Sequence, residues 1–300
     1  MTPEVSRLRR ALLVIVAPIL LLGAGAGLGV AAYLVWFNAL RRQPAPLQMP
    51  LFQGVTYERR VSRSPRPVVS HLVRVRIDAP GIRFFVTRPR PHGGRRLRAQ
   101  TVSGFLERNH LQLAINGDFF RPWRSDGLWD YYPKEGDPVD VYGLSCSGRR
   151  CHGRATPGRP ALYFSCSGSV SFRRPPRDLC HAISGISLLR DGQVHLGPIP
   201  ARRHPRTAVA LDREERHLLL LVVDGRQPGF SEGVTPRELA LLARGAGGHN
   251  AVNLDGGGSS ALVMEKDGKP HQLSSPIHTR LVGRERPVAN HLGVGARTLP

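Results

Sequence analysis

The sequence predicts a mixed α/β fold, in which helices pack on a sheet, and three consecutive segments support this fold class. Residues 217–223 are apolar at nearly every position, which is typical of a strand buried on both faces. Residues 235–246 begin with the capping-box pattern Thr-Pro-Arg-Glu and continue with apolar residues at helical spacing. Residues 251–254 form a second short apolar run. Strand, helix and strand joined by short links predict a right-handed crossover between parallel strands.

Each of these two strands is followed directly by an aspartate. Asp224 comes after the first strand and Asp255 after the second. Parallel strands joined in this way end at one edge of the sheet, which is where α/β sheets place their ligands. If the two strands are neighbours, their carboxylates lie within about 5–10 Å of each other. We therefore expect the functional site at this edge.

A loop with few side chains follows Asp255. Residues 256–258 are glycines, and Ser259 and Ser260 come next. Glycines let the backbone adopt φ > 0 and approach a ligand closely, with amide N–H groups turned towards an anion. The two hydroxyl groups add hydrogen-bond donors at the same place. The alternative is a tight turn that binds nothing.

Composition sets the broad class of the protein. The chain has 300 residues, 41% of them hydrophobic, with 33 glycines and 26 prolines, which indicates a globular protein rich in turns. Its net charge of +21 favours anionic partners. No nucleic-acid-binding module is recognisable, so a nucleic acid partner is not expected.

The N-terminal region predicts a membrane anchor. Residues 11–37 are uncharged and mostly apolar, and a bilayer span needs about 20 such residues. Arginines 7, 9 and 10 precede the run, which predicts that the N-terminus stays in the cytoplasm. Residues 1–42 therefore comprise the cytoplasmic N-terminus and the transmembrane anchor. A cleaved signal peptide is the alternative, but its apolar core is usually shorter. Residues 43–50 are then a linker, and residues 51–300 form one domain in the periplasm or outside the cell.

The four cysteines lie in the loop-rich section of residues 121–180. They are Cys146, Cys151, Cys166 and Cys180. In an oxidising compartment they predict two disulfides, most simply Cys146–Cys151 and Cys166–Cys180, although three pairings are possible. Zinc binding is the alternative, but no C-x₂-C pair is present.

The remaining chain predicts short strands, loops and one short helix. In order they are alternating strands over 51–86, a basic loop over 88–98, a helix over 101–108, a strand over 111–115, a strand and turn over 182–192, a strand over 204–212 and a last strand after residue 290.

Seven short motifs, taken together and in order, resemble the phosphodiester glycosidase family over roughly residues 110–295. They are Asn116-Gly117-Asp118-Phe119-Phe120, Ile183-Ser184-Gly185, residues 204–209, Asp224-Gly225-Arg226, residues 235–240, residues 253–260 and residues 285–290. The resemblance implies a single phosphodiester-glycosidase-like domain after the N-terminal helix. It also implies hydrolysis of a sugar-1-phosphodiester at the glycosidic carbon, which releases the sugar and leaves phosphate on the other product.

This chemistry needs a cationic group for the departing phosphate and a carboxylate near the anomeric carbon. Arg206 suits the phosphate because a guanidinium binds it through two hydrogen bonds, although a surface salt bridge is the alternative. Asp255 is the expected nucleophile or general base, unless it only organises the loop. Asp224 and Glu285 complete the predicted catalytic set; the first is equally suited to capping a loop, and the second to an interior ion pair with Arg286.

A further set of residues is predicted to bind substrate because each is polar, or is a loop glycine, within the motifs. They are Asn116, Thr207, Gly256, Gly257, Ser259, Ser260, Arg286 and Asn290.

No cofactor is predicted. Oxygen ligands at Asp224, Asp255 and Glu285 would suit Ca²⁺ or Mg²⁺, but their spacing resembles no known loop for either ion, so no metal residues are assigned. The expected substrate is a phosphorylated glycan of the envelope or an exopolysaccharide. The alternative function is a non-catalytic envelope protein that binds glycan or phosphate on the same fold. Nothing in the sequence indicates the oligomeric state.

Overall fold

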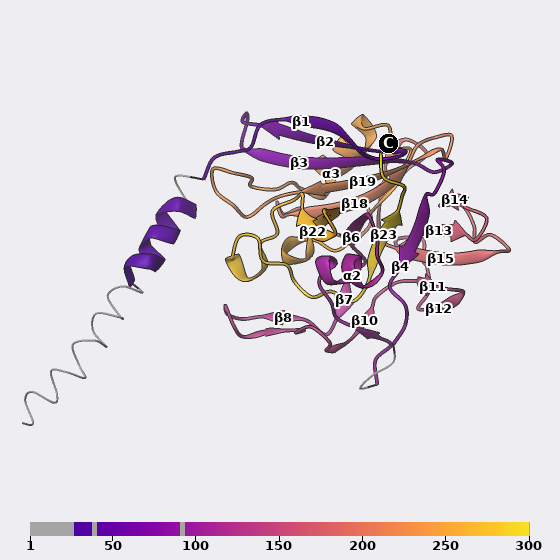
Figure 1. The fold of residues 1–300 in the computed structure, drawn as a ribbon, viewed down its shortest axis with the longest axis horizontal. Coiled ribbons are helices and arrows are strands. Elements are labelled where there is room, and N and C mark those ends of the chain that lie inside the picture. The colour runs from indigo at the N-terminus through magenta and orange to yellow at the C-terminus, as the bar shows by residue number, and fades with distance from the viewer. Residues whose placement is uncertain (1–26, 38–40, 91–93, 300) are drawn as a thin grey trace, which may run out of the picture. The chain divides into compact units, whose positions relative to one another are not determined.

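The computed structural model describes residues 27–37, 41–90 and 94–299. The chain divides into two compact units, Met1–Arg42 and Gln43–Pro300 (Figure 1). In the first unit residues 27–37 are helical. The described residues contain no helix that is both long enough and apolar enough to cross a membrane. Most of the anchor predicted over residues 11–37 lies outside them, and the anchor is not confirmed.

The second unit is rich in strands. Its largest sheet has eight antiparallel strands in the order β1 (Leu47–Phe52), β2 (Val55–Ser62), β3 (Val68–Arg76), β19 (His217–Val223), β18 (Arg206–Leu211), β20 (Asn250–Asn253), β16 (Ile186–Arg190) and β17 (Gln193–Val194). Strand β1 begins inside the segment predicted as a linker, and its proline is tolerated because β1 is an edge strand.

A second antiparallel sheet packs against the first. Its strands run in the order β22 (Lys269–Gln272), β21 (Leu262–Lys266), β6 (Leu113–Asn116), β23 (His291–Gly295) and β4 (Arg83–Val86). The core between the sheets includes Leu220 and Val73 from the first and Ile115, Leu262 and Val294 from the second. This face-to-face packing contains the largest cluster of buried apolar residues.

Helices cover the outer faces of the two sheets. Helix α3 (Pro236–Gly245) packs on the first sheet, and Leu239 of the helix belongs to the same buried apolar cluster as Leu219 and Leu221 of β19. Strand β19 is therefore buried on both faces, as predicted, because its alternate side chains enter the two cores. The predicted capping box of Thr235 is also present. Helix α2 (Val102–Arg108) packs on the second sheet. The order of layers is helix, sheet, sheet, helix.

The two strands predicted to be parallel do run in the same direction, but they are not adjacent in the sheet. Strands β19 and β20 run the same way, but β18 lies between them and is antiparallel to both. Strands β18 and β19 are joined by a short turn and pair as a hairpin, and β3 pairs with the other edge of β19, so β20 pairs with the remaining edge of β18. The start of β18 thus lies at the same edge as the ends of β19 and β20.

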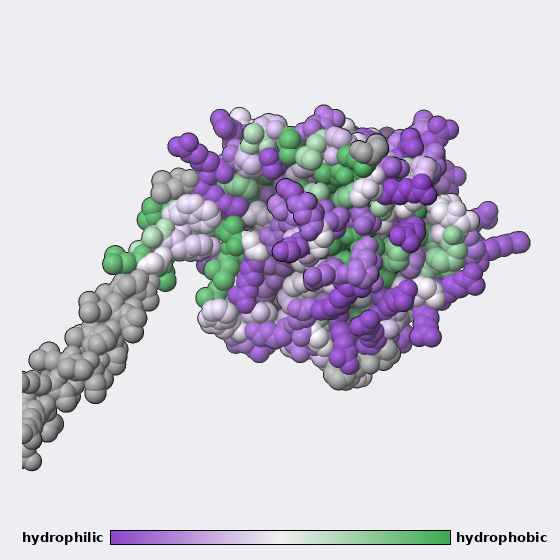
Figure 2. All heavy atoms as spheres, viewed as in Figure 1, coloured by the Kyte–Doolittle hydropathy of each residue, from purple (hydrophilic) through white to green (hydrophobic). Residues whose placement is uncertain are grey.

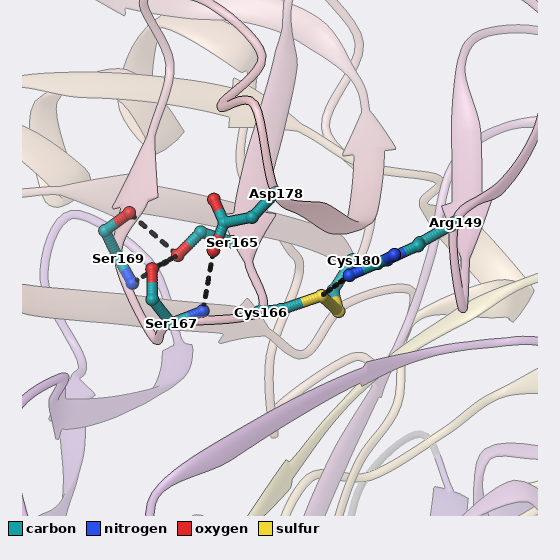
Figure 3. The surroundings of a disulfide bond; sticks show 7 residues. All are labelled: Arg149, Ser165, Cys166, Ser167, Ser169, Asp178 and Cys180. Atoms are coloured by element: carbon teal, nitrogen blue, oxygen red, sulfur yellow. Dashed lines mark hydrogen bonds between the residues drawn. A yellow bond between two sulfur atoms is a disulfide. The ribbon is translucent and has the colours of Figure 1, made fainter.

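The cysteine-containing section forms a small sheet as well as loops. Its strand order is β12 (Arg150–His152), β11 (Ser145–Ser147), β15 (Leu179–Ser184), β13 (Ala161–Ser165) and β14 (Val170–Ser171). The disulfides are Cys146–Cys151 and Cys166–Cys180, the simplest of the predicted pairings. Figure 3 shows the second, with the side chain of Arg149 directed at the sulfur of Cys166.

Two minor sheets complete the unit. One has the order β5 (Leu97–Arg98), β10 (Pro138–Val141) and β7 (Phe120–Arg121), and the other pairs β8 (Arg124–Ser125) with β9 (Tyr131–Tyr132). The β8–β9 hairpin reaches out from the body of the unit in Figure 1. Hydrophilic side chains cover much of the face seen in Figure 2, in keeping with the net charge of +21.

Candidate active site

Asp255 lies just after β20 and is partly exposed as a residue. Its backbone N–H donates to the carbonyl of Gly117 at 2.9 Å. Its Oδ1 accepts from the N–H of Gly256 at 2.8 Å, and its Oδ2 accepts from the hydroxyl of Ser259 at 2.6 Å. Each carboxylate oxygen has two lone pairs, so each retains acceptor capacity for a ligand.

Two arginines flank the loop that follows Asp255. A Cβ atom added to Gly257 would lie 2.8 Å from an Nη of Arg226, and one added to Gly258 would lie 2.8 Å from an Nη of Arg286. The glycines therefore let two guanidinium groups rest against the backbone. The amides of Gly256 and Gly257 are engaged within the protein, by Asp255 and by the carbonyl of Pro205. The main role of these glycines is thus to leave room for the two arginine side chains. The predicted role, in which their amide N–H groups face an anion, fits less well because the amides of Gly256 and Gly257 already have partners.

The two guanidinium groups retain donors for an anion. Nη1 of Arg286 lies 3.3 Å from the hydroxyl oxygen of Ser259. Within the described part of the chain, the Nη groups of Arg226 have no hydrogen-bond partner. The charge of Arg280 acts on Arg226 as well, which concentrates positive charge here. A phosphodiester offers the oxygen atoms that such an array binds.

A histidine fixes each arginine at its Nε. Arg226 donates to Nδ1 of His204 at 3.3 Å, and Arg286 donates to Nδ1 of His278 at 3.2 Å. Each imidazole must then keep a lone pair on Nδ1. Burial and the nearby arginines lower the pKa of His204 to about 4 and that of His278 to about 3, so both rings are neutral at physiological pH.

The surroundings of Asp255 raise the pKa of its carboxyl overall. Burial raises the pKa of this carboxyl, while the hydrogen bond from Ser259 and the charges of Arg286 and Arg226 oppose the rise. The arrangement places a carboxylate close to two oriented cations. It can hold a phosphate with its neighbouring carbon close to the carboxylate.

Arg206, predicted to hold the phosphate, is placed differently. Its Nε donates to the carbonyl of Val234 at 3.1 Å, and one Nη donates to that of Arg202 at 2.7 Å. The side chain is buried, with 5% exposed. These contacts organise the loop before β18. Arg226 and Arg286, which lie against the loop after Asp255, are better placed than Arg206 for the predicted phosphate-binding role.

Asp224 and Glu285 also make structural contacts. Asp224 is buried and accepts from the backbone N–H of Ser275 at 2.7 Å, and its other oxygen lies 2.9 Å from Nε2 of His71. Glu285 accepts from the N–H of Ser103 at 3.0 Å, in the first turn of α2. Among the described residues no group of three His, Cys, Asp or Glu side chains is arranged to hold a metal ion.

The predicted amide and hydroxyl residues hold the loops together. Asn116 donates to the carbonyl of Asp255 at 2.8 Å and accepts from the hydroxyl of Thr207 at 2.7 Å. Asn290 accepts from the N–H of Asp118 at 2.9 Å. The hydroxyl of Ser260 is buried and has no hydrogen-bond partner in the described structure. Of the predicted substrate-binding residues, only Ser259 and Arg286 have side chains that act on the carboxylate of Asp255.

Asp118 was not among the predicted site residues, although it stands in a recognised motif. It is fully buried and pairs with Arg159, and it accepts from the hydroxyl of Ser184 at 2.9 Å and the N–H of Gly143 at 3.0 Å. Burial raises the pKa of Asp118 to about 6. Two motifs meet here, and through Gly117 they support the Asp255 loop.

Comparison with known proteins agrees with this assembly of motifs. Residues 109–295 match the model of a family described as phosphodiester glycosidase. The chain belongs to the phosphodiester glycosidase family. The resemblance predicted from the motifs is thereby confirmed. This is a glycosidase-type enzyme family, so glycan hydrolysis is the function indicated at the family level.

Solved structures show the same fold. The catalytic domain of zebrafish N-acetylglucosamine-1-phosphodiester alpha-N-acetylglucosaminidase, auto-inhibited by its pro-peptide, is similar with a TM-score of 0.55 and 20% identity over 85% of each chain. A hypothetical protein from Synechocystis is similar with a TM-score of 0.54 and 16% identity, over 85% of this chain and 64% of that one. No curated protein matches the sequence. The two disulfides of this member of the family indicate an extracytoplasmic domain.

Proposed function

We propose that this protein hydrolyses the glycosidic bond of a sugar-1-phosphodiester in an envelope or exopolysaccharide glycan. The observation that carries the proposal is the carboxylate of Asp255, a partly exposed residue, beside Arg226 and Arg286. The disulfides and the net charge of +21 favour an anionic substrate outside the cytoplasm.

The arginines take the phosphate group of the substrate. Their Nη donors bind its non-bridging oxygens, and His204 and His278 hold each guanidinium in orientation through its Nε. As the bond between the anomeric carbon and oxygen breaks, negative charge grows on the phosphate. Fixed cations in a partly dry site stabilise that charge strongly. A phosphate monoester is also a good leaving group, so the reaction needs little proton donation.

Asp255 acts on the anomeric carbon. As a nucleophile it would form a glycosyl ester that water then hydrolyses, and as a general base it would activate water directly. Ser259 orients the carboxylate through the bond to Oδ2. In either route one water is consumed, its oxygen ends on the sugar, and the phosphate leaves on the other product.

Hydrolysis in H₂¹⁸O tests the bond that breaks. The proposal expects the label in the released sugar and none in the phosphomonoester. Label in the phosphate would instead identify a phosphodiesterase that cuts the P–O bond. The substrates are a panel of sugar-1-phosphodiesters incubated with the full-length protein in detergent, with and without a chelator, and both products are identified.

A matched pair of variants separates enzyme from binding protein. Asp255→Asn should abolish turnover while the protein remains folded. Asp78→Asn is the control, because Asp78 is 78% exposed and follows β3 at the opposite edge of the main sheet. Binding of the panel without turnover by the unmodified protein would support the non-catalytic alternative.

A further inference from the structure

The β8–β9 hairpin exposes two large aromatic side chains. Trp123 is 57% exposed and Trp129 is 74% exposed. They are the only tryptophans of the second unit, since the third in the chain is Trp36. Leaving a large aromatic side chain in water forgoes the stabilisation that burial of its apolar surface would give. Two such residues on one short hairpin therefore indicate a surface that meets a ligand.

This hairpin is connected to the candidate active site through arginines. The guanidinium of Arg286, which contacts Ser259 beside Asp255, lies 5.3 Å from the ring centre of Trp123. Arg284 lies 5.3 Å from the ring centre of Trp129 and donates to the carbonyl of Leu128 at 2.8 Å. The same segment that carries an arginine to the carboxylate therefore orients the aromatic rings.

Other contacts hold the hairpin in one conformation. Arg284 donates to the hydroxyl of Tyr131 at 2.9 Å, and the Tyr131 ring meets His278 edge-on at 4.5 Å between centres. Lys134 donates to the carbonyl of Trp129 at 2.7 Å. A surface that is ordered in advance loses less conformational entropy on binding.

We propose that Trp123 and Trp129 form a carbohydrate subsite beside the phosphate position, on which a sugar ring of the glycan chain stacks. The proposal rests on the proposed function, and it makes the preferred substrate an oligosaccharide or polysaccharide whose sugars flank the phosphodiester. Each tryptophan meets an arginine on one side and remains largely open to solvent. An aromatic face packs well against the C–H groups of a sugar ring, and the adjacent cations attract an anionic chain.

Kinetics with two substrates test the subsite. The long substrate is a synthetic oligosaccharide joined by sugar-1-phosphodiesters, and the short one is the methyl ester of N-acetylglucosamine-1-phosphate. Trp129→Ala should lower the ratio of kcat/KM for long over short substrate by about 3- to 10-fold, mainly through KM. Trp129→Phe keeps an aromatic face and should restore most of the ratio. Leu241→Ala, a truncation at a 40% exposed position on α3, should leave the ratio unchanged.

Fluorescence tests the subsite without turnover. In full-length Trp36→Phe, all tryptophan emission comes from residues 123 and 129. The long substrate should change this emission in a saturable way, even if the protein hydrolyses neither substrate. A saturable emission change without hydrolysis of either substrate would contradict the proposed function but support the subsite. An unchanged kinetic ratio in Trp129→Ala, or an emission change with a uridine diphosphate sugar but not with the oligosaccharide, would overturn the subsite.

Discussion

Asp255 and Asp224 occupy equivalent places in the chain, because each follows an apolar strand of the main sheet and precedes a glycine. Their surroundings differ. Asp255 is partly exposed and meets two arginines, whereas Asp224 is buried against His71 and the N–H of Ser275. The same local pattern thus yields a carboxylate suited to chemistry at one strand and a structural one at the other. What decides between them is the set of loops that reaches each strand end.

The largest expected effect comes from replacing the two aspartates, which tests the difference between them directly. Asp255→Asn should reduce kcat by about 10³-fold or more with little change in Tm. The amide oxygen still accepts from the N–H of Gly256 and the amide nitrogen can donate to the oxygen of Ser259, but the charge is lost. Asp224→Ala should instead lower the free energy of unfolding by about 2–4 kcal/mol, since His71 and a buried N–H lose their partner. Denaturation curves and kinetics on both variants check this. Equal loss of activity in a folded Asp224 variant would show that both aspartates serve the reaction.

The arginines give the next contrast. Arg226→Ala and Arg286→Ala should each reduce kcat/KM by about 10²- to 10³-fold with a nearly unchanged Tm, because they would bind the departing phosphate. Arg206→Ala should lower Tm, since the carbonyls of Val234 and Arg202 lose a buried donor. A stable but inactive Arg206→Ala variant would instead show that Arg206 binds the phosphate.

Two glycines sharpen the comparison further. Gly257 has φ +64 and Gly268 has φ +75, so alanine strains the backbone at both. Only at Gly257 would the new methyl group meet the guanidinium of Arg226, because nothing lies within 4 Å of a Cβ at Gly268. Gly257→Ala should therefore lower kcat/KM by about 10- to 100-fold beyond Gly268→Ala, at similar cost in stability. Equal kinetics would mean that the position of Arg226 is unimportant.

The smallest effect is a dependence of stability on pH. The pKa of buried His278 falls from 6.5 to about 3 on folding, so the unfolded chain binds more protons between these values. Acidification below pH 6.5 should then lower the free energy of unfolding by up to about 1.4 kcal/mol per pH unit for this residue, until pH passes through about 3. His278→Asn, whose amide oxygen replaces Nδ1 as an acceptor, should reduce that slope. An unchanged slope in urea denaturation would contradict the assignment.

The sequence alone was sufficient for features that depend on local pattern. A continuous apolar run predicted that β19 is buried on both faces, and Thr235 with Glu238 predicted the start of α3. Close spacing made Cys146–Cys151 the simplest pair. The order of motifs was enough to indicate the family. Asp255 was recognised because a carboxylate at a strand end before a glycine loop is visible in the sequence, and its catalytic role remains a prediction.

Only the tertiary structure decided which side chains face one another. Arg226 stands in a recognised motif, but its closeness to the Asp255 loop depends on how three strand ends meet at one edge. Glu285 and Arg286 are adjacent in sequence, yet the first contacts α2 and the second contacts Ser259. Neighbouring residues of an extended segment point to opposite sides, and what each side meets depends on segments far away in the chain. No local pattern carries that information.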